Sequence, residues 1–231
     1  MLKLLWIADL LAGPLYKAYL FVFKGVDISL LADVRLRQIA NLSFGRNIII
    51  EKYCMLDAAG TSRITLGDNV ILQRGAQLLN YAGEGISIGR DTTIGRNSIL
   101  FGHGGLEMGE GCLVGPCCSF IPANHRFDDT DLNIKQQGVT RKGIVVGNNV
   151  WFGAHAVVLD GIRIGDNCII GAGSVVTRAI PSNSVAVGAP AKVIKTRPEA
   201  LGGPATLPAG GSDPATPDDS PSPTATTGDA D

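Results

Sequence analysis

Three histidines, His103, His125 and His155, are the side chains of this chain best suited to moving a proton near neutral pH. The pKa of an unperturbed imidazole is about 6.5, so its neutral form can take the proton of a hydroxyl group that attacks a carbonyl. His125 follows Asn124 at the point where a regular repeat stops and a long irregular stretch begins. A residue at such a boundary faces outwards beside a loop, where a substrate can reach it. We therefore predict that His125 is a general base, with an ordinary surface histidine as the alternative.

The other two histidines have weaker claims to a role. His155 is expected to face outwards from its repeat, and a role at a subunit interface and simple exposure are equally open. His103 stands between Gly102 and Gly104 at an expected strand end, where it would either contact an acceptor or be a surface residue. Asn97 is a further, weaker candidate for acceptor binding.

The sequence around His125 identifies no single side chain that would orient its imidazole. Asn124, Asp128 and Asp129 are candidates by proximity alone, and acidic residues in loops are usually solvated. The five cysteines contain no C-x-x-C spacing, and nothing brings a base to the adjacent pair Cys117-Cys118. We therefore predict neither a metal site nor a cysteine nucleophile.

A six-residue repeat dominates Val146–Val176, which reads VGNNVWFGAHAVVLDGIRIGDNCIIGAGSVV. An apolar residue recurs there at every sixth position and is often followed by glycine. This period is too short for a helical hairpin or a propeller blade, and it predicts a β-helix. The repeating positions are Phe44, Ile50, Leu66, Leu72, Ile88, Ile94, Met108, Val114, Val146, Phe152, Val158, Ile164, Ile170 and Val176.

Three six-residue strands make one 18-residue turn between Val146 and Ile164, so we predict an all-β, three-sided parallel β-helix over residues 44–197. A longer interval of 38 residues separates Met108 from Val146, and the excess of 20 residues predicts a loop excursion over residues 126–143.

Small residues at the fifth position of each repeat should point inwards. Four cysteines fall at that position and are expected to be buried, reduced thiols. Triplets such as Gly165-Asp166-Asn167 should mark the corners, because glycine, asparagine and aspartate tolerate positive φ. The four cysteines are Cys54, Cys112, Cys118 and Cys168.

The formal net charge of −1 provides no basic surface for nucleic acid. Six acidic residues and no basic ones follow Arg197, so −1 plus 6 leaves a net charge of +5 on residues 1–197, which suits an anionic cofactor. The tail, residues 198–231, is rich in Pro, Ala, Thr and Asp and is predicted to be disordered.

Residues 4–23, within a predicted helical segment 1–43, are strongly apolar but contain Asp9, Pro14 and Lys17. The charges argue against a membrane-spanning helix, and the absence of a cleavage site argues against a signal peptide. We predict two short helices that break near Pro14. They either cap the open end of the β-helix or lie in a membrane interface.

The C-terminal repeats resemble the left-handed β-helix acyltransferases of the maltose and galactoside O-acetyltransferase type. The matching segments are residues 148–153, 164–176 and 187–194, and the resemblance covers about residues 44–197. It implies a left-handed coil, acetyl-CoA as acyl donor, a homotrimer with active sites between subunits, and a bacterial, cytoplasmic protein. It also implies that His125 is the catalytic base, in a ternary complex without an acyl-enzyme or a metal.

The resemblance implies further binding residues. Pantetheine would pass the backbone of Gly153, Ala154 and Ala172, and the CoA phosphates would pair with basic residues near the C-terminal end, for which plain surface charge is the alternative. Acceptor-binding residues would include Trp151, which is expected to face outwards. The predicted phosphate-binding residues are Lys192, Lys195 and Arg197, and the predicted acceptor-binding residues are Asn97, His103, Asn124 and Trp151.

Three other functions are weighed against this interpretation. A γ-type carbonic anhydrase has the same fold but needs two metal-binding histidines close in sequence, whereas the histidines here are 22 and 30 residues apart. An N-acetyltransferase acting on an amino sugar and a non-catalytic binding or scaffold protein stay open. The apolar N-terminus favours a lipid-linked acceptor. We therefore predict an O-acetyltransferase that acts on a sugar of an exopolysaccharide or O-antigen precursor, at the inner face of the membrane.

Overall fold

The computed structural model describes residues 27–28, 34–81 and 83–198. The predicted N-terminal helices and, apart from Pro198, the predicted C-terminal tail lie outside the described residues. Among the residues described, no helix has the length and apolar character that crossing a membrane requires.

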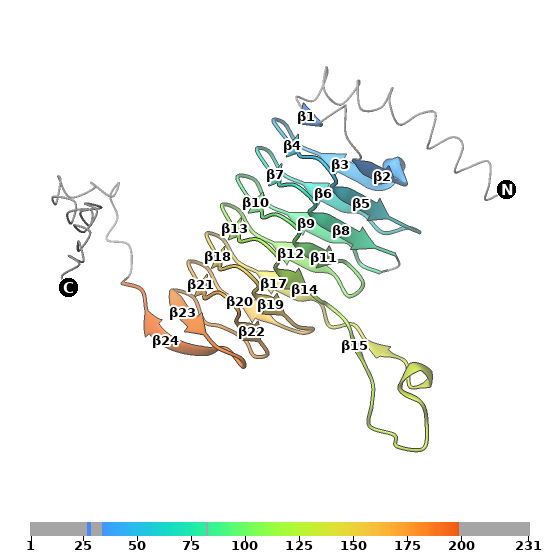
Figure 1. Cartoon of the computed structure of the whole chain (residues 1–231), viewed down its shortest axis with the longest axis vertical. Coiled ribbons are helices and arrows are strands. Elements are labelled where there is room, and N and C mark those ends of the chain that lie inside the picture. The colour runs from blue at the N-terminus through green and yellow to red at the C-terminus, as the bar shows by residue number, and fades with distance from the viewer. Residues whose placement is uncertain (1–26, 29–33, 82, 199–231) are drawn as a thin grey trace, which may run out of the picture. The chain divides into compact units, whose positions relative to one another are not determined.

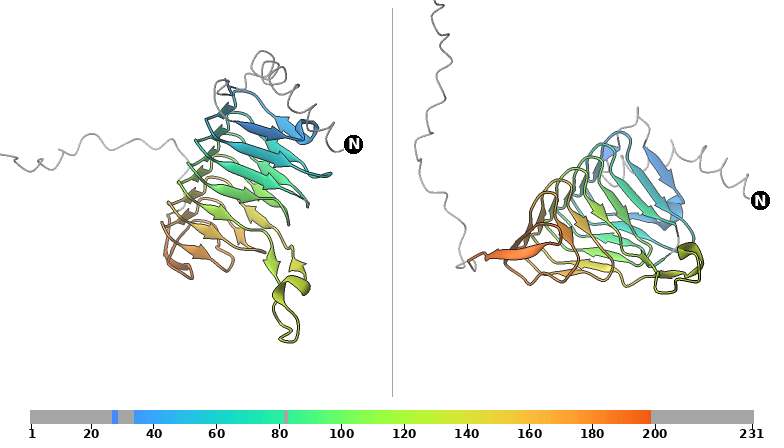
Figure 2. Two further views of the ribbon diagram at one scale, coloured as in Figure 1. Left: turned by 45° about the vertical axis from the view of Figure 1, so that its right-hand side comes forward. Right: turned by 60° about the horizontal axis from the view of Figure 1, so that its bottom comes forward.

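Three sheets form the sides of a triangular prism, and their strands are parallel except for β24, which pairs antiparallel with β23 (Figures 1 and 2). From β2 to β23, and apart from the hairpin strands β15 and β16, consecutive strands of the chain belong to different sheets, so that each turn of the chain lies on the turn before it. We call the three sides sheet A, sheet B and sheet C. The predicted three-sided parallel β-helix is confirmed.

The strands of each sheet, in spatial order and within the described residues, are as follows. Sheet A contains β1 (Asp27–Ile28), β4 (Ile49–Ile50), β7 (Ile71–Leu72), β10 (Thr93–Ile94), β13 (Leu113–Val114), β18 (Trp151–Phe152), β21 (Ile169–Ile170), β23 (Ser184–Val187) and β24 (Lys192–Thr196). Sheet B contains β2 (Arg35–Arg37), β5 (Met55–Ala58), β8 (Gln77–Asn80), β11 (Ile99–Phe101), β14 (Ser119–Phe120), β19 (Val157–Val158) and β22 (Val175–Val176). Sheet C contains β3 (Leu42–Phe44), β6 (Ile64–Leu66), β9 (Ile86–Ile88), β12 (Leu106–Met108), β17 (Ile144–Val146) and β20 (Arg163–Ile164).

The core is a set of inward-facing columns, one residue per turn of the chain. On sheet A the parallel register aligns the repeating apolar residues, each at most 1% exposed. Phe152 of this column meets Phe120 edge to face, with ring centroids 5.0 Å apart. Full burial of such a side chain stabilises the folded state by about 1.5–3 kcal/mol relative to leaving it exposed. The six-residue period therefore determines which side chains form the core. The sheet A column consists of Ile50, Leu72, Ile94, Val114, Phe152, Ile170 and Ala186.

Small inward residues at the fifth position link neighbouring turns. Cys54 Sγ donates to the carbonyl of Gln73 at 3.2 Å, and Ser98 Oγ donates to the carbonyl of Gly115 at 3.0 Å. All four cysteines predicted at this position are buried and free. They are therefore structural thiols, as expected.

Positive φ occurs where sheet C turns into sheet A. The φ angle is 55° at Asn47, 59° at Asn69 and 58° at Asp91. The same side chains join successive corners, since Asn69 Nδ2 donates to Asp91 Oδ1 at 2.7 Å. Asparagine and aspartate thus serve both the turn geometry and the stacking of the coil.

The β-helix begins before Phe44, where the sequence pattern predicted its start. Arg35 of β2 aligns with Met55 of β5, and Leu42 of β3 aligns with Ile64 of β6. The described part of segment 1–43 contains short strands and one 3-10 turn, η1 (Ile39–Asn41). The two helices predicted within residues 4–23 lie outside it. Because residues 34–43 contain no glycine, the six-residue period is not readable there.

A hairpin replaces one corner of the prism. The chain leaves after β14, and β15 (Asn124–His125) pairs antiparallel with β16 (Val139–Thr140) before the chain returns at β17. A 3-10 turn, η2 (Ile134–Gln136), lies between the two strands. The hairpin projects from the prism in Figure 1. The predicted excursion of residues 126–143 therefore starts slightly earlier, and His125 lies within its first strand.

Candidate active site

Hydrogen bonds across the hairpin fix the backbone of His125. His125 aligns with Val139 in the antiparallel pair, and the N–H of Arg126 donates to the carbonyl of Gly138 at 3.1 Å. The His125 side chain is exposed. The hairpin therefore presents an imidazole to solvent from a paired strand rather than from a free loop.

The carboxylate of Asp160 holds the returning limb of the hairpin. Its Oδ1 accepts the N–H groups of Lys142 at 2.8 Å and Gly143 at 3.1 Å, and its Oδ2 accepts the Thr140 hydroxyl at 3.0 Å. Asp160 lies in the corner of the next turn of the chain and is half-buried. Hydrogen bonds to an ionised group contribute about 1.5–3 kcal/mol each, so this residue sets the position of the hairpin root.

The preceding corner supports the hairpin from the other side. A Cβ on Gly104 would overlap the carbonyl of Pro122 and crowd the backbone of Arg141 and Gly143. The N–H of Ile144 donates to the carbonyl of Gly105 at 2.9 Å. Only glycine at position 104 leaves room for the backbone at both ends of the hairpin to pass this close to the corner.

A pocket of about 300 Å³ opens at the root of the hairpin. It brings together three of the predicted site residues, His125, His103 and Asn124, from two turns of the chain. Its remaining walls are mainly apolar, as is typical of sites that bind small molecules. The lining residues are Phe101, His103, Ile121, Ala123, Asn124, His125, Val139 and Arg141.

His103 sits among aromatic rings. Its ring centroid lies 5.5 Å from that of Phe101 and 5.8 Å from that of Tyr81. Burial and, to a smaller extent, the charge of Arg141 lower the pKa of His103 below its ordinary value. His103 is therefore a neutral ring in the pocket wall near neutral pH.

Two predicted acceptor-binding residues lie elsewhere in the single chain. Asn97 is at a corner between sheets A and B, with φ of 56°, and Trp151 faces outwards from sheet A with 49% of its surface exposed. Neither lines the pocket of His125. His155 also occupies the corner between sheets A and B, with φ of 60°, so it is remote from His125.

The predicted pantetheine site is an exposed ridge at the corner between sheets A and B. The N–H of Gly173 donates to the carbonyl of Ala154 at 2.8 Å, so successive corners stack closely. A Cβ on Gly153 would overlap the backbone of Ala172. Within the described part of the chain, the N–H groups of Ala154 and Ala172 donate no hydrogen bond. This ridge therefore contains two backbone donors that have no acceptor among the described residues.

The three predicted phosphate-binding residues differ in their exposure and in whether their charged groups already have a partner. Lys192 and Lys195 are exposed on β24 and form no ion pair with any other described residue. Arg197 is half-buried, and its guanidinium donates to the carbonyl of Asn167 at 2.9 Å. The two lysines are thus the more available cations.

No side chain described in the structure hydrogen-bonds the imidazole of His125. Asp129 instead serves its own loop, since its Oδ1 accepts the N–H of Asp131 at 2.9 Å. Asp128 and Asn124 are exposed. In the single chain, none of the three predicted partners orients His125.

Sequence reasoning did not identify Phe101, Arg141 or Asp160 as site residues. Phe101 precedes His103 by two positions, a spacing that brings both to one strand end. Arg141 and Asp160 become part of the site only through the hairpin and through the alignment of turns about 20 residues apart. In the described residues, no group of three or more His, Cys, Asp or Glu side chains is arranged to hold a metal ion.

Comparison with known proteins identifies the repeat. Residues 143–178 match the family model described as bacterial transferase hexapeptide (six repeats), and residues 85–115 match that described as hexapeptide repeat of succinyl-transferase. A protein of Mycobacterium tuberculosis named as an acetyltransferase, Rv3034c, is 38% identical over 112 residues, which are 48% of this chain. The match spans only 37% of that relative's own length.

A second relative matches over most of its length. WbbJ of Escherichia coli, named as a lipopolysaccharide biosynthesis O-acetyl transferase, is 31% identical over 163 residues, which cover 69% of this chain and 74% of WbbJ. Among solved structures, a mutant of AntD, an N-acyltransferase from Bacillus cereus in complex with dTDP and coenzyme A, superposes with a TM-score of 0.59. It is 24% identical and covers 68% of this chain and 84% of AntD, a likeness that concerns the fold. With its coil, its repeats and its relatives in agreement, the chain belongs to the hexapeptide-repeat family of bacterial acyltransferases.

Proposed function

We propose that this protein transfers an acetyl group from acetyl-CoA to a hydroxyl of a sugar, with His125 as general base. The observation that carries the proposal is the pocket at the hairpin root, where an exposed imidazole on a fixed strand faces apolar and aromatic walls. The family of the chain supports acyl transfer as the reaction. The name of WbbJ supports a polysaccharide or O-antigen precursor as the acceptor.

The proposed reaction is a direct attack in a ternary complex. The acceptor hydroxyl oxygen bonds to the thioester carbonyl carbon while an imidazole nitrogen of His125 takes the hydroxyl proton. The carbon–sulfur bond then breaks, and the proton passes from His125 to the leaving sulfur. The products are the sugar acetate and the free thiol of CoA.

The donor is proposed to bind along the ridge formed by Gly153, Ala154 and Ala172. The free N–H groups of Ala154 and Ala172 suit the amide carbonyls of pantetheine. Lys192 and Lys195 suit the phosphates of CoA. Arg197 contributes through whichever guanidinium donors its bond to Asn167 leaves free.

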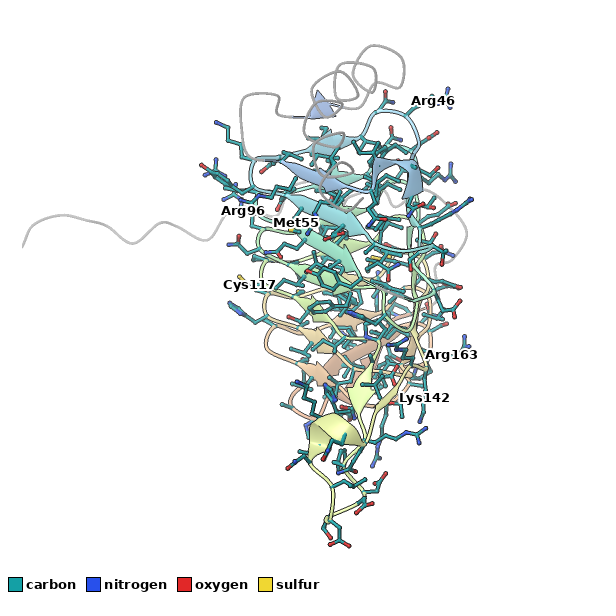
Figure 3. The ribbon with its side chains drawn as sticks, turned by 90° about the vertical axis from the view of Figure 1, so that its right-hand side faces the viewer. Arg46, Met55, Arg96, Cys117, Lys142 and Arg163 are labelled. Atoms are coloured by element: carbon teal, nitrogen blue, oxygen red, sulfur yellow. The ribbon has the colours of Figure 1, made fainter. Side chains whose placement is uncertain are left out.

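Catalysis in this arrangement requires more than one copy of the chain. His125 stands at the edge between sheets B and C, whereas the donor ridge is the edge between sheets A and B. One six-residue side of the prism, roughly 20 Å at about 3.3 Å per residue, separates the two edges. Figure 3 shows the separation, with Arg96 and Cys117 of the A–B edge opposite Lys142 at the hairpin root. We propose a homotrimer in which a neighbouring copy brings its donor ridge, and with it Asn97 or Trp151, to His125.

An acceptor assembled on a lipid carrier would place the enzyme at the cytoplasmic face of the membrane, where acetyl-CoA is available. The apolar residues 4–23 would suit such contact.

The experiment that tests the function follows thiol release from acetyl-CoA over a panel of sugars, amino sugars and nucleotide sugars. Ester formation on a hydroxyl, identified by NMR of the product, is the expected result. Amide formation on an amino sugar would replace O-transfer by N-transfer. Failure of acetyl-CoA to bind at all would reduce the protein to a binding or scaffold protein.

A further inference from the structure

Arg141 supplies an uncompensated positive charge to the pocket of His125. It lines the pocket directly after β16, and none of the other lining residues is acidic. Among the residues described, no carboxylate forms an ion pair with Arg141, whereas Arg37, Arg46 and Arg90 each have an acidic partner. A guanidinium in this position is available to a ligand.

The backbone of Arg141 is held more firmly than that of an ordinary surface arginine. The residues on both sides, Thr140 and Lys142, hydrogen-bond the same carboxylate of Asp160, at 3.0 and 2.8 Å. Gly104 packs against the Arg141 backbone from below. The start of the side chain is therefore fixed at the pocket rim, which lowers the entropic cost of binding.

No carboxylate in the described part of the chain forms an ion pair with Arg141. The oxygens of Asp160 accept hydrogen bonds from Thr140, Lys142 and Gly143 at the hairpin root. The Lys142 side chain packs against Gly161 of the next corner and does not line the pocket. His103 stays neutral because burial and the Arg141 charge lower its pKa. Near neutral pH, the fixed charge lining this pocket is positive.

We propose that the acceptor is an anionic glycan whose carboxylate or phosphate is bound by Arg141 in the pocket where His125 deprotonates its hydroxyl. The inference rests on the proposed function and names its substrate class. The planar guanidinium binds either oxyanion through two parallel N–H donors. The apolar face of the sugar ring lies against Phe101 and His103, whose rings line the same wall. With its anionic group on Arg141 and its ring against the aromatic wall, the sugar presents a hydroxyl group to His125.

The test compares one neutral and two anionic acceptors that share the glucose ring. Acetyl transfer to methyl glucoside, methyl glucuronide and glucose 1-phosphate is measured with wild-type protein and with Arg141→Gln, Arg141→Lys and Arg126→Gln. Arg126 is the matched control, since it is an exposed arginine on the same hairpin that does not line the pocket. The two charged acceptors separate a sugar carboxylate from a phosphate as the source of the anion.

We expect wild-type kcat/KM to favour one anionic acceptor over methyl glucoside by about tenfold or more, and this preference to weaken between about 50 and 500 mM salt. Arg141→Gln should lose most of the preference through a higher KM, with a smaller loss for methyl glucoside, and Arg141→Lys should restore part of it. Arg126→Gln should behave as wild type. Equal or better use of the neutral glycoside by the wild-type protein would overturn the inference, as would an equal loss for all acceptors in Arg141→Gln.

A binding measurement separates this inference from the proposed reaction. If no acceptor is acetylated, the proposed function fails, and NMR titration of both proteins with methyl glucuronide and inorganic phosphate decides the anion site. About tenfold weaker binding to Arg141→Gln would uphold the anion site, and unchanged binding would refute it.

Discussion

Asp160 Oδ1 accepts the backbone N–H of Lys142 at 2.8 Å. The corner of the coil that contains Asp160 therefore holds the strand of the hairpin that returns from His125. The register of the solenoid puts this carboxylate beneath the hairpin root. Fixing the root fixes the strand pair, and the strand pair fixes His125. In the proposed mechanism Asp160 is thus a positioning residue, because it acts on the proposed base through the hairpin backbone.

Replacing Asp160 should reduce turnover more than it reduces stability. We expect Asp160→Ala to lower kcat by about tenfold or more, since a 1 Å displacement of a catalytic group can cost about a hundredfold. Asp160→Asn keeps an oxygen acceptor for the N–H groups and should recover part of the loss. Asp128→Ala removes an exposed acid of the same hairpin and is the control. An Asp160→Ala enzyme with wild-type kcat would show that the hairpin root needs no such clamp.

An apolar column on the outer face of sheet A should form part of the subunit interface. Leu113 and Trp151 are neighbours in register, and each exposes about half of its surface, 50% and 49%. Adjacent exposed apolar residues of this size usually meet a partner. We expect Leu113→Glu to convert the trimer to monomers and to abolish transfer, as judged by light scattering and thiol release. Ser87→Glu, on the outer face of sheet C, should leave the trimer intact. A wild-type monomer, or a Leu113→Glu trimer, would contradict the proposed assembly.

The cysteines should differ sharply in reactivity. Cys54, Cys112, Cys118 and Cys168 are buried, and burial raises the pKa of each thiol, to about 11 for Cys54. Cys117 is the only partly exposed one of the five. A thiol reagent at about pH 8 should therefore modify one thiol per native chain and all five after unfolding, because only the accessible thiolate reacts. Rapid modification of a second native thiol would contradict the buried positions, and Cys117→Ser is the control that should show none.

Stability should fall at alkaline pH through Cys54. The folded state keeps the Cys54 proton up to about pH 11, whereas the unfolded chain releases it near the ordinary value of 9.0. Between these values the folded state binds more protons, so the free energy of unfolding decreases as pH rises through this window. Cys54→Ala should show a shallower decrease in denaturant midpoint between about pH 8.5 and 10.5. An identical slope in the two proteins would argue against the raised pKa.

The repeat made the interior readable from the sequence. The repeating apolar residues, such as Phe152, and the residues at the fifth position of each repeat, such as Cys118, are buried as predicted. A period of six assigns each side chain to the inside or the outside of the coil. The period fails where the chain has no glycine corners, so the turn of the coil that contains β2 (Arg35–Arg37) and Leu42 was not predicted. Residues 4–23 lie outside the described residues, so the two helices predicted there stay a prediction.

The site was only partly readable. His125 was predicted because it stands at the break in the repeat, and His103 because the chain has few histidines; both line the pocket. The excursion has no period of its own, so the strand pairing that holds His125 and aims Arg141 at the pocket had no signal in the sequence. Asp160 reaches the hairpin from a turn 20 residues away from Thr140, a contact that only the stacked register reveals.

The most direct measurement is the rate of acetyl transfer by His125→Ala beside Arg126→Gln, with acetyl-CoA binding measured on both. The account predicts that His125→Ala loses about 10²–10⁴-fold in kcat while it still binds acetyl-CoA and remains assembled. Arg126→Gln, which changes the exposed residue next to His125 that does not line the pocket, should stay within a few-fold of wild type. Wild-type turnover by His125→Ala would contradict the central claim that the hairpin exists to hold the base.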